Sequence, residues 1–275
     1  MLYKIKNKKV KIILKDETIE LPSELKEQIN ENFEKMRKTG ANIWNGEVLC
    51  VSKYNIEEDE IKIVCKKSDY AHYLYGERIG CTSQYECKNI SAGCLLETID
   101  GYYIVGELDE KTSYPTMLQV TGGGIDKKDI FNGNIDVENT IKREAMEELK
   151  INLNNKENIL YNGISYLYIS GDNEQPGVQL FAKAKIKMTT EEMKKYLKEN
   201  NLEIEFGRLH FLKKENALEE LEKLSNPRRN YLIPLLQMDS KGGIYEGFIK
   251  NKLFWHSRNN DNSRKLFRKY ATKSI

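Results

Sequence analysis

A run of three glycines followed by a glutamate-rich segment constrains this chain more than any other stretch of it. Glycines 122–124 precede the segment 143–149, which reads REAMEEL. Residues three and four apart on a helix share a face, so Glu144, Glu147 and Glu148 are expected to project together. Three carboxylates on one ridge repel one another, and a hard cation such as Mg²⁺ relieves that repulsion. The segment therefore predicts a divalent-metal site on a helix, with a solvated acidic face as the alternative.

The glycines are the second half of this candidate site. Glycine accepts positive φ and lets the backbone approach a ligand closely, so a carbonyl here can face a metal and an amide can face a phosphate oxygen. An ordinary turn is the alternative, but the glutamate helix that follows favours a functional loop. Arg143 stands four residues before Glu147 and is expected to pair with a glutamate and fix its rotamer.

These residues resemble the Nudix box, G-x5-E-x7-R-E-U-x-E-E-x-G-U, the signature of Nudix hydrolases. The R-E-U-x-E-E core is matched in full by residues 143–148. The gap from Gly124 to Arg143 is 18 residues (125–142) where the pattern has 13, so an inserted loop is expected within 126–134. Lys150 replaces the late glycine of the pattern.

One position of the box has no direct match. Counted back from Arg143, the first glutamate of the pattern falls on Ile135. Glu138 and Asp129 are imperfect replacements for it, and the sequence does not choose between them.

The resemblance implies a fold and a division of the chain. The expected fold class is α/β (α+β), a Nudix-type α/β/α sandwich with a mixed β-sheet, plus an N-terminal β-hairpin and helix extension. Residues 1–89 would form the extension, 90–250 the Nudix hydrolase domain and 251–275 a basic C-terminal tail.

The resemblance also implies a reaction and a role for each residue. The chain would be a Mg²⁺-dependent (or Mn²⁺-dependent) pyrophosphohydrolase that cleaves a nucleoside diphosphate linked to a group X, such as ADP-ribose or a nucleotide sugar, with a metal-activated water. Glu144 and Glu148 would be inner metal ligands, Glu147 a ligand or the base, and Arg143 would orient the glutamates. The expected further contributors are the carbonyl of Gly124 as a ligand, Gly122 and Gly123 toward the substrate, and one extra glutamate: Glu203, Glu205 or the competitor Glu174.

Two other functions stay open at this stage. One is a non-catalytic Nudix-like sensor that binds a nucleotide or ADP-ribose, which Ile135 and the lengthened loop favour and the retained Glu147-Glu148 pair argues against. The other is an RNA-cap-processing Nudix enzyme, suggested only by the basic tail over residues 256–275.

Composition limits the partners and the location. Lys+Arg 44 against Asp+Glu 42 gives a net charge of +2, without the global field typical of a nucleic-acid or membrane binder. The N-terminal segment has charges scattered among its apolar residues, which argues against a signal peptide and a spanning segment, so a cytoplasmic protein is expected. We expect a small-molecule partner, no membrane and no nucleic acid, and a homodimer is possible in this family. The five cysteines lack CxxC spacing and are expected to be reduced and mostly buried.

Hydrophobic periodicity and turn residues predict the elements along the chain. Expected strands cover parts of 2–14, as exposed or edge strands, and the ranges 47–53, 60–66, 95–98, 102–107, 117–121, 159–170, 178–187 and 202–212. Expected helices cover 24–38, a Tyr-rich segment at 69–75, a helix capped by Asp136, and 189–199, 215–224 and 227–238. The tyrosines are expected to pack against the sheet, with stacking on a base or sugar as the alternative. Arg228 and Arg229 are expected in solvent, with a phosphate contact as the alternative.

Overall fold

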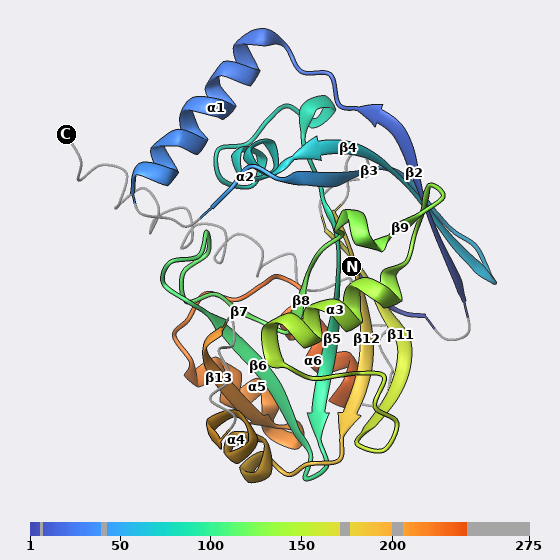
Figure 1. Cartoon of the computed structure of the whole chain (residues 1–275), viewed down its shortest axis with the longest axis vertical. Coiled ribbons are helices and arrows are strands. Elements are labelled where there is room, and N and C mark those ends of the chain that lie inside the picture. The colour runs from blue at the N-terminus through green and yellow to red at the C-terminus, as the bar shows by residue number, and fades with distance from the viewer. Residues whose placement is uncertain (6–7, 40–42, 171–176, 200–205, 241–275) are drawn as a thin grey trace.

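The larger of two sheets forms the centre of the molecule. The computed structural model describes residues 1–5, 8–39, 43–170, 177–199 and 206–240 (Figure 1). In these ranges the larger sheet has the order β1-β11-β12-β5-β6-β13, with β7 paired to β6 and β8 paired to β5. Its strands are β1 (Leu2–Lys4), β5 (Ile90–Thr98), β6 (Tyr102–Leu108), β7 (Leu118–Gln119), β8 (Thr121–Gly124), β11 (Ile159–Ser170), β12 (Gly177–Ile186) and β13 (Phe206–Lys213). The sheet is mixed, because β12 and β5 run parallel and the other pairs are antiparallel.

Helices cover both faces of this sheet. Successive residues of a strand point to opposite faces, and on β5 Leu96 packs with Ile141 of the helix α3 while Leu95 packs with Leu235 of the helix α6. The helices are α1 (Ser23–Lys38), α2 (Tyr70–Arg78), α3 (Val137–Leu149), α4 (Thr190–Glu199), α5 (Ala217–Lys223) and α6 (Leu232–Ser240), with short 3-10 turns at Ser83–Tyr85, Lys127–Asp129 and Lys214–Asn216. Figure 1 shows α3 in front of the sheet and α6 behind it. The expected α/β class with a mixed sheet between helices is confirmed.

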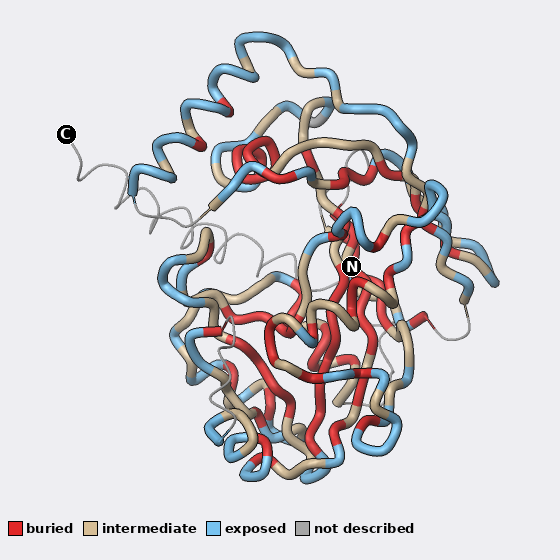
Figure 2. Tube along the Cα trace, in the orientation of Figure 1, coloured by how far each residue is buried: buried red, intermediate tan, exposed pale blue. Residues whose placement is uncertain are grey.

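The smaller sheet stands above the larger one and carries α1 and α2 (Figure 1). Its order is β3-β4-β2-β10-β9, with β2 (Lys9–Thr18), β3 (Glu47–Ile56), β4 (Glu60–Asp69), β9 (Ile130–Phe131) and β10 (Asn134–Ile135). Buried residues of this sheet, such as Ile12 and Ile63, join the same core cluster as Ile141 of α3. Figure 2 shows burial concentrated in the strands of the larger sheet, while α1 is largely exposed.

Strand pairing crosses between the first ninety residues and the rest of the chain. β1 lies at the edge of the larger sheet against β11, with Tyr3 paired to Leu167. In return β10 joins the smaller sheet, with Asn134 paired to Ile13 of β2. β1 is an edge strand, whereas β2 lies between β4 and β10 and is mostly exposed or half-buried, which fits the expectation of exposed or edge strands. The division at residue 90 stays a prediction, and these two pairings show how the two parts are joined.

Most of the predicted elements are present, and two differ in a way that non-local contacts explain. The strand expected at 117–121 is split into β7 and β8, and the helix expected from Pro227 begins at Leu232. The amide of Leu118 donates to the carbonyl of Pro227 at 2.8 Å, and the amide of Arg229 donates to the carbonyl of Leu118 at 3.0 Å. Residues 227–229 therefore run beside β7 before the helix starts.

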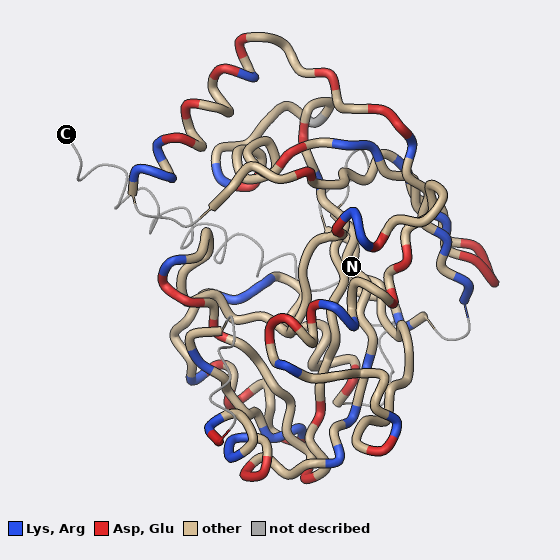
Figure 3. Tube along the Cα trace, in the orientation of Figure 1, with Lys and Arg blue, Asp and Glu red and all other residues tan. Residues whose placement is uncertain are grey.

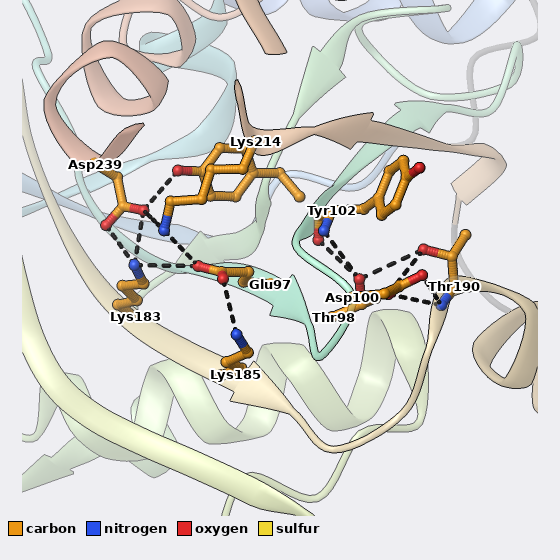
Figure 4. Close-up of polar contacts among 10 residues, drawn as sticks. Glu97, Thr98, Asp100, Tyr102, Lys183, Lys185, Thr190, Lys214 and Asp239 are labelled. Atoms are coloured by element: carbon orange, nitrogen blue, oxygen red, sulfur yellow. Dashed lines mark hydrogen bonds and ion pairs between the residues drawn. The ribbon is translucent and has the colours of Figure 1, made fainter. Parts of the chain in front are cut away.

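The helix α6 is tied to the sheet by a buried ionic cluster (Figure 4). The carboxylate of Asp239 is only 3% exposed, and both its oxygens lie 2.7 Å from Nζ of Lys183. The hydroxyls of Tyr103 and Tyr166 each donate to it at 2.6 Å. Hydrogen bonds and ion pairs to both carboxylate oxygens offset the free-energy cost of burying this charge.

The cysteines and the Tyr-rich helix follow the predictions. The cysteines are free, and four of them are buried while Cys81 is half-buried. Tyr73 and Tyr75 of α2 pack in one cluster with Cys50 of the smaller sheet, as predicted, and also with Phe33 of α1. No helix in the described ranges combines the length and apolar character needed to cross a bilayer.

Candidate active site

The glycine strand β8 packs directly against α3. β8 pairs antiparallel with β5, where Gly122 is opposite Gly93 and Gly123 is opposite Ala92. Gly122 has φ +148°, and a Cβ on it would lie 2.4 Å from the carbonyl oxygen of Ala92. A Cβ on Gly123 would lie 2.6 Å from Oε1 of Glu144. Gly122 therefore needs glycine because the contact is with backbone, and the lack of a side chain at Gly123 leaves room for the carboxylate of Glu144 beside the strand.

Glu148 is anchored to the same strand. Its residue is buried at 4% exposure, and Oε2 accepts hydrogen bonds from the hydroxyl of Thr121 at 2.5 Å and from the amide of Gly122 at 2.7 Å. Charge-assisted bonds of this kind hold a carboxylate in one orientation. The helix and the glycine strand are thus joined through an acidic side chain rather than through apolar packing alone.

Arg143 connects the remaining groups of the site. One terminal nitrogen, Nη1, lies 2.7 Å from Glu144 and 2.9 Å from Glu147. The other, Nη2, donates to Asp129 at 3.0 Å and to the carbonyl of Gly124 at 3.2 Å. Burial alone would lower the pKa of Arg143, but the neighbouring carboxylates of Asp129 and Glu144 raise it above its usual value. The expected role of Arg143 as an orienter of glutamates agrees with these contacts.

Asp129 and Glu138 are the two residues that could replace the first glutamate of the pattern, and the sequence does not choose between them. Its carboxylate is fully buried and forms the ion pair with Arg143, whereas Glu138 accepts a hydrogen bond from the hydroxyl of Tyr161 instead. Burial would raise the pKa of Asp129, but hydrogen bonds from Arg143 and from the amide of Asp126 hold it below its usual range. Asp129, rather than Glu138, therefore lies beside Arg143.

The inserted segment explains how Asp129 reaches Arg143. Lys127–Asp129 forms a 3-10 turn capped by Asp126, and β9 and β10 then form a tight hairpin with positive φ at Asn132 (51°) and Gly133 (72°). The hairpin returns the chain to the start of α3, where the carboxylate of Asp136 accepts from the amide of Asn139 at 3.1 Å. Ile135, the position that matches the first glutamate by count, is instead a buried core residue.

The structure brings most of the predicted site residues together. Glu144 and Glu148 contact β8, whereas Glu147 contacts Arg143 and has a more exposed side chain, at 45%. Figure 3 shows residues of both charge signs side by side along α3. The extra-glutamate candidates Glu174, Glu203 and Glu205, like the basic tail, lie outside the described residues.

The donor set suits a hard cation by its chemistry. All the candidate ligands are carboxylate or carbonyl oxygens, which Mg²⁺ and Mn²⁺ prefer. Within the described ranges no three acidic, histidine or cysteine side chains converge on one point, and Arg143 bridges Glu144 and Glu147 instead. The residues fit the metal in the kind of donor atom they offer, and its binding would compete with these contacts of Arg143.

Thr121 and the two arginines near residue 228 were not predicted correctly. No local pattern singles out Thr121, although it directly precedes the glycines and its hydroxyl donates to Glu148. Arg228 and Arg229 were expected in solvent, but both are half-buried. Arg228 donates to the carbonyls of Leu221 and Leu224 at 3.2 and 3.1 Å, which ties down the end of α5.

Comparison with known proteins finds similarity in solved structures. No family model matches the sequence, and no curated protein matches it. The chain is similar to an Ap4A hydrolase of C. elegans in a binary complex (15% identity, 56% of this chain, 96% of that chain, TM-score 0.37). It is also similar to a NUDIX hydrolase from Nitrosomonas europaea (12% identity, 57% of this chain, 91% of that chain, TM-score 0.38). A third similar structure is the MutT protein from Methanosarcina mazei Go1 (11% identity, 56% of this chain, 93% of that chain, TM-score 0.38). Similarity this distant carries no argument about the activity of the chain.

Proposed function

We propose that this chain is a Nudix pyrophosphohydrolase that uses Mg²⁺ or Mn²⁺ to cleave a nucleoside diphosphate linked to a group X, such as ADP-ribose or a nucleotide sugar. The observation that carries the proposal is the contact of two glutamates of α3, Glu144 and Glu148, with the glycine strand β8, completed by the Arg143–Asp129 ion pair. The resemblance to the Nudix box and this geometry both support the proposal: the spacing places Arg143 and the glutamates on one helix, and the fold adds their contacts with β8 and Asp129.

Each residue has a distinct part in the proposed reaction. Glu144 and Glu148 would hold the cation with the carbonyl of Gly124, and the cation would supply charge neutralisation at the phosphates and a more acidic water. Thr121 and Gly122 keep Glu148 oriented. Glu147, the more exposed carboxylate, would bind the cation or accept the proton of the attacking water. Arg143 positions Glu144 and Glu147 through its Nη1 contacts.

Replacing Glu148 by glutamine tests the assignment directly. The Glu148→Gln variant keeps the shape of the side chain and an acceptor for Thr121 and Gly122, so we expect folding to persist and turnover to fall by about 100-fold or more. Turnover is measured as nucleoside monophosphate released from ADP-ribose, nucleotide sugars, dinucleoside polyphosphates and nucleoside triphosphates with Mg²⁺. Glu138→Gln, on the same helix but bound to Tyr161, is the matched control and should retain activity. Normal turnover by folded Glu148→Gln would remove the assignment.

Metal removal is a second test of the same site. Because the donors are all oxygens, we expect EDTA to abolish hydrolysis and added Mg²⁺ or Mn²⁺ to restore it. The measurement is product release before and after chelation, with circular dichroism to show that the chain stays folded. Hydrolysis that continues unchanged in EDTA contradicts the proposal.

A non-catalytic sensor is the second candidate, and one observation favours it. Arg143 occupies Glu144 and Glu147 at once, an arrangement that satisfies these charges without a metal. Calorimetry with the same nucleotides, followed by product analysis, separates the candidates. Heat of binding without cleavage identifies a sensor, and cleavage identifies the enzyme.

A further inference from the structure

A half-buried guanidinium without an acidic partner lies beside the candidate active site. The guanidinium carbon of Arg229 lies 4.2 Å from the centroid of the Tyr114 ring, and its Nε donates to Oε1 of Gln119 at 3.3 Å. Within the described part of the chain, no carboxylate forms an ion pair with Arg229 and its Nη nitrogens have no hydrogen-bond partner. Removing a cation from water without a counter-charge is unfavourable, so such a group indicates a missing anion.

A second arginine lies beside the same ring. The guanidinium carbon of Arg78, on α2, lies 5.3 Å from the Tyr114 centroid, and its Nη2 donates to the carbonyl of Ser113. Glu77, next to Arg78 in the chain, forms an ion pair with Lys88 at 3.8 Å. Arg78 and Arg229 thus place two guanidinium groups around one tyrosine ring. One of them is supplied by the N-terminal ninety residues.

The path from Arg229 to the glutamates is short. Its partner Gln119 is two residues before Thr121, whose hydroxyl contacts Glu148. Leu118 and Val120 point into the core on the α6 side, so Gln119 and Thr121 point the other way, toward the side of α3. Two residues of extended chain span about 7 Å, which places both side chains within reach of one substrate.

The contacts of Arg229 leave one edge of the guanidinium available. Gln119 holds Nε and Tyr114 covers one face, while the Nη edge has no described partner. That edge is the planar fork that binds phosphate through two parallel hydrogen bonds. Burial alone would lower the pKa of Arg229, but its tyrosine and Glu77 neighbours raise it, so the group stays cationic.

We infer that Arg229 binds a phosphoryl group of the substrate, with Tyr114 and Gln119 holding the guanidinium in position and Arg78 of α2 contributing positive charge. This inference rests on the proposed function and deepens it. It gives the N-terminal region a role as one wall of the substrate site. The ligand class is an anion with at least two linked phosphates, one at the glutamates and one at Arg229.

Chemical labelling of arginine tests the inference in the full wild-type chain. Phenylglyoxal reacts with accessible arginine side chains, and peptide mass spectrometry reports the reaction of each arginine. The probe is methylenediphosphonate with Mg²⁺, an uncleaved analogue of a diphosphate. We expect Arg229 to react in the free protein and to be protected at least about fivefold by the probe. Arg228, whose Nη groups are bound to carbonyls, is the internal control and should not respond. Labelling of Arg229 that the probe does not change, or no labelling at all, overturns the inference.

Variants give a second, kinetic readout. Loss of a charge-assisted bidentate contact weakens binding by about 10- to 100-fold, so Arg229→Gln should raise KM by that factor with kcat within about threefold. Arg208→Gln, an exposed arginine on β13, is the matched control and should leave KM unchanged. Arg229→Lys keeps the charge without the fork and should give an intermediate KM. An unchanged KM in a folded Arg229→Gln or Arg229→Lys variant overturns the inference.

These results separate the inference from the proposed function. If the wild-type chain cleaves none of the substrates and the probe still protects Arg229, the proposed function fails and the inference stands. The opposite outcome has three parts: the chain cleaves a substrate, the probe does not protect Arg229, and the Arg229 variants keep the wild-type KM. In that case the inference fails and the proposed function stands.

Discussion

At the scale of residues, a buried ion pair holds the candidate site in shape. Asp129 is fully buried and contacts Arg143, which in turn contacts Glu144 and Glu147. A charge in such a position is stabilising only while its partner remains, because an unpaired buried charge has lost its water without compensation. The geometry of the glutamates therefore depends on a residue that is not itself expected to touch the substrate.

Neutralising this aspartate tests that dependence. We expect Asp129→Asn to lower the free energy of unfolding by about 2 kcal/mol, because Arg143 keeps its other partners but loses the buried one. We also expect slower turnover, since Arg143 can then move and take Glu147 with it. Urea unfolding and product release measure the two effects. Asp136→Asn is the control, because asparagine also caps a helix N-terminus. Full stability and full turnover in Asp129→Asn would contradict this account.

The sequence predicts the site residues that are close together in the chain and misses those that are not. Arg143 and the three glutamates share one helix, so their spacing alone places them on one face. Asp129 is separated from Arg143 by an inserted hairpin, and only the fold of that hairpin brings the two together. Arg229 is more than a hundred positions from Tyr114, and no local pattern relates them.

At the scale of elements, α6 depends on charge as well as on apolar packing. Leu232, Leu235 and Leu236 are fully buried against the sheet, and Asp239 then inserts its carboxylate between Lys183 and Lys214. Glu97 of β5 contacts the same two lysines, at 3.3 and 2.8 Å (Figure 4). This cluster fixes the end of the helix to four strands, β5, β6, β11 and β12, and to the turn that begins at Lys214.

This cluster predicts a loss of stability in acid. Burial would raise the pKa of Asp239, but hydrogen bonds and charges from Lys183, Tyr103 and Tyr166 lower it to about 2, from 3.8. A lowered folded-state pKa contributes stability that is complete above the unfolded pKa and is lost as the pH falls through the folded one. We expect the free energy of unfolding of the wild type to be higher than that of Asp239→Asn, and this difference should be constant above pH 5. That difference should shrink by about 2 kcal/mol between pH 4 and pH 2. Urea titrations across this range measure it, and a difference independent of pH would exclude Asp239 as the cause.

Local patterns predict the elements that need only local information. The amphipathic spacing of α1, the cap of α3 and the Asp100-Gly101 turn between β5 and β6 are each specified by neighbouring residues. The start of α6 and the break between β7 and β8 are set by hydrogen bonds of Leu118 with residues 227–229. Such contacts depend on how the chain returns to the sheet, which periodicity does not encode.

At the scale of the whole molecule, two sheets exchange strands and share one core. β1 belongs to the larger sheet although the rest of the first ninety residues builds the smaller one, and β10 belongs to the smaller sheet although it follows β8. Residues from both sheets meet in a single hydrophobic cluster with α3. The N-terminal region is therefore an integral part of the fold around the candidate site.

The position of β1 has a consequence for how the chain matures during synthesis. Its partner residues, Tyr166–Tyr168, leave the ribosome more than 160 residues later, so β1 has no partner strand until they have been synthesised. Bringing such distant segments together is entropically slow, and the newborn amino terminus stays open to other partners in the meantime. A bulky group placed next to β1 would interfere with this pairing, because the nitrogen of Met1 itself donates to the carbonyl of Ile169.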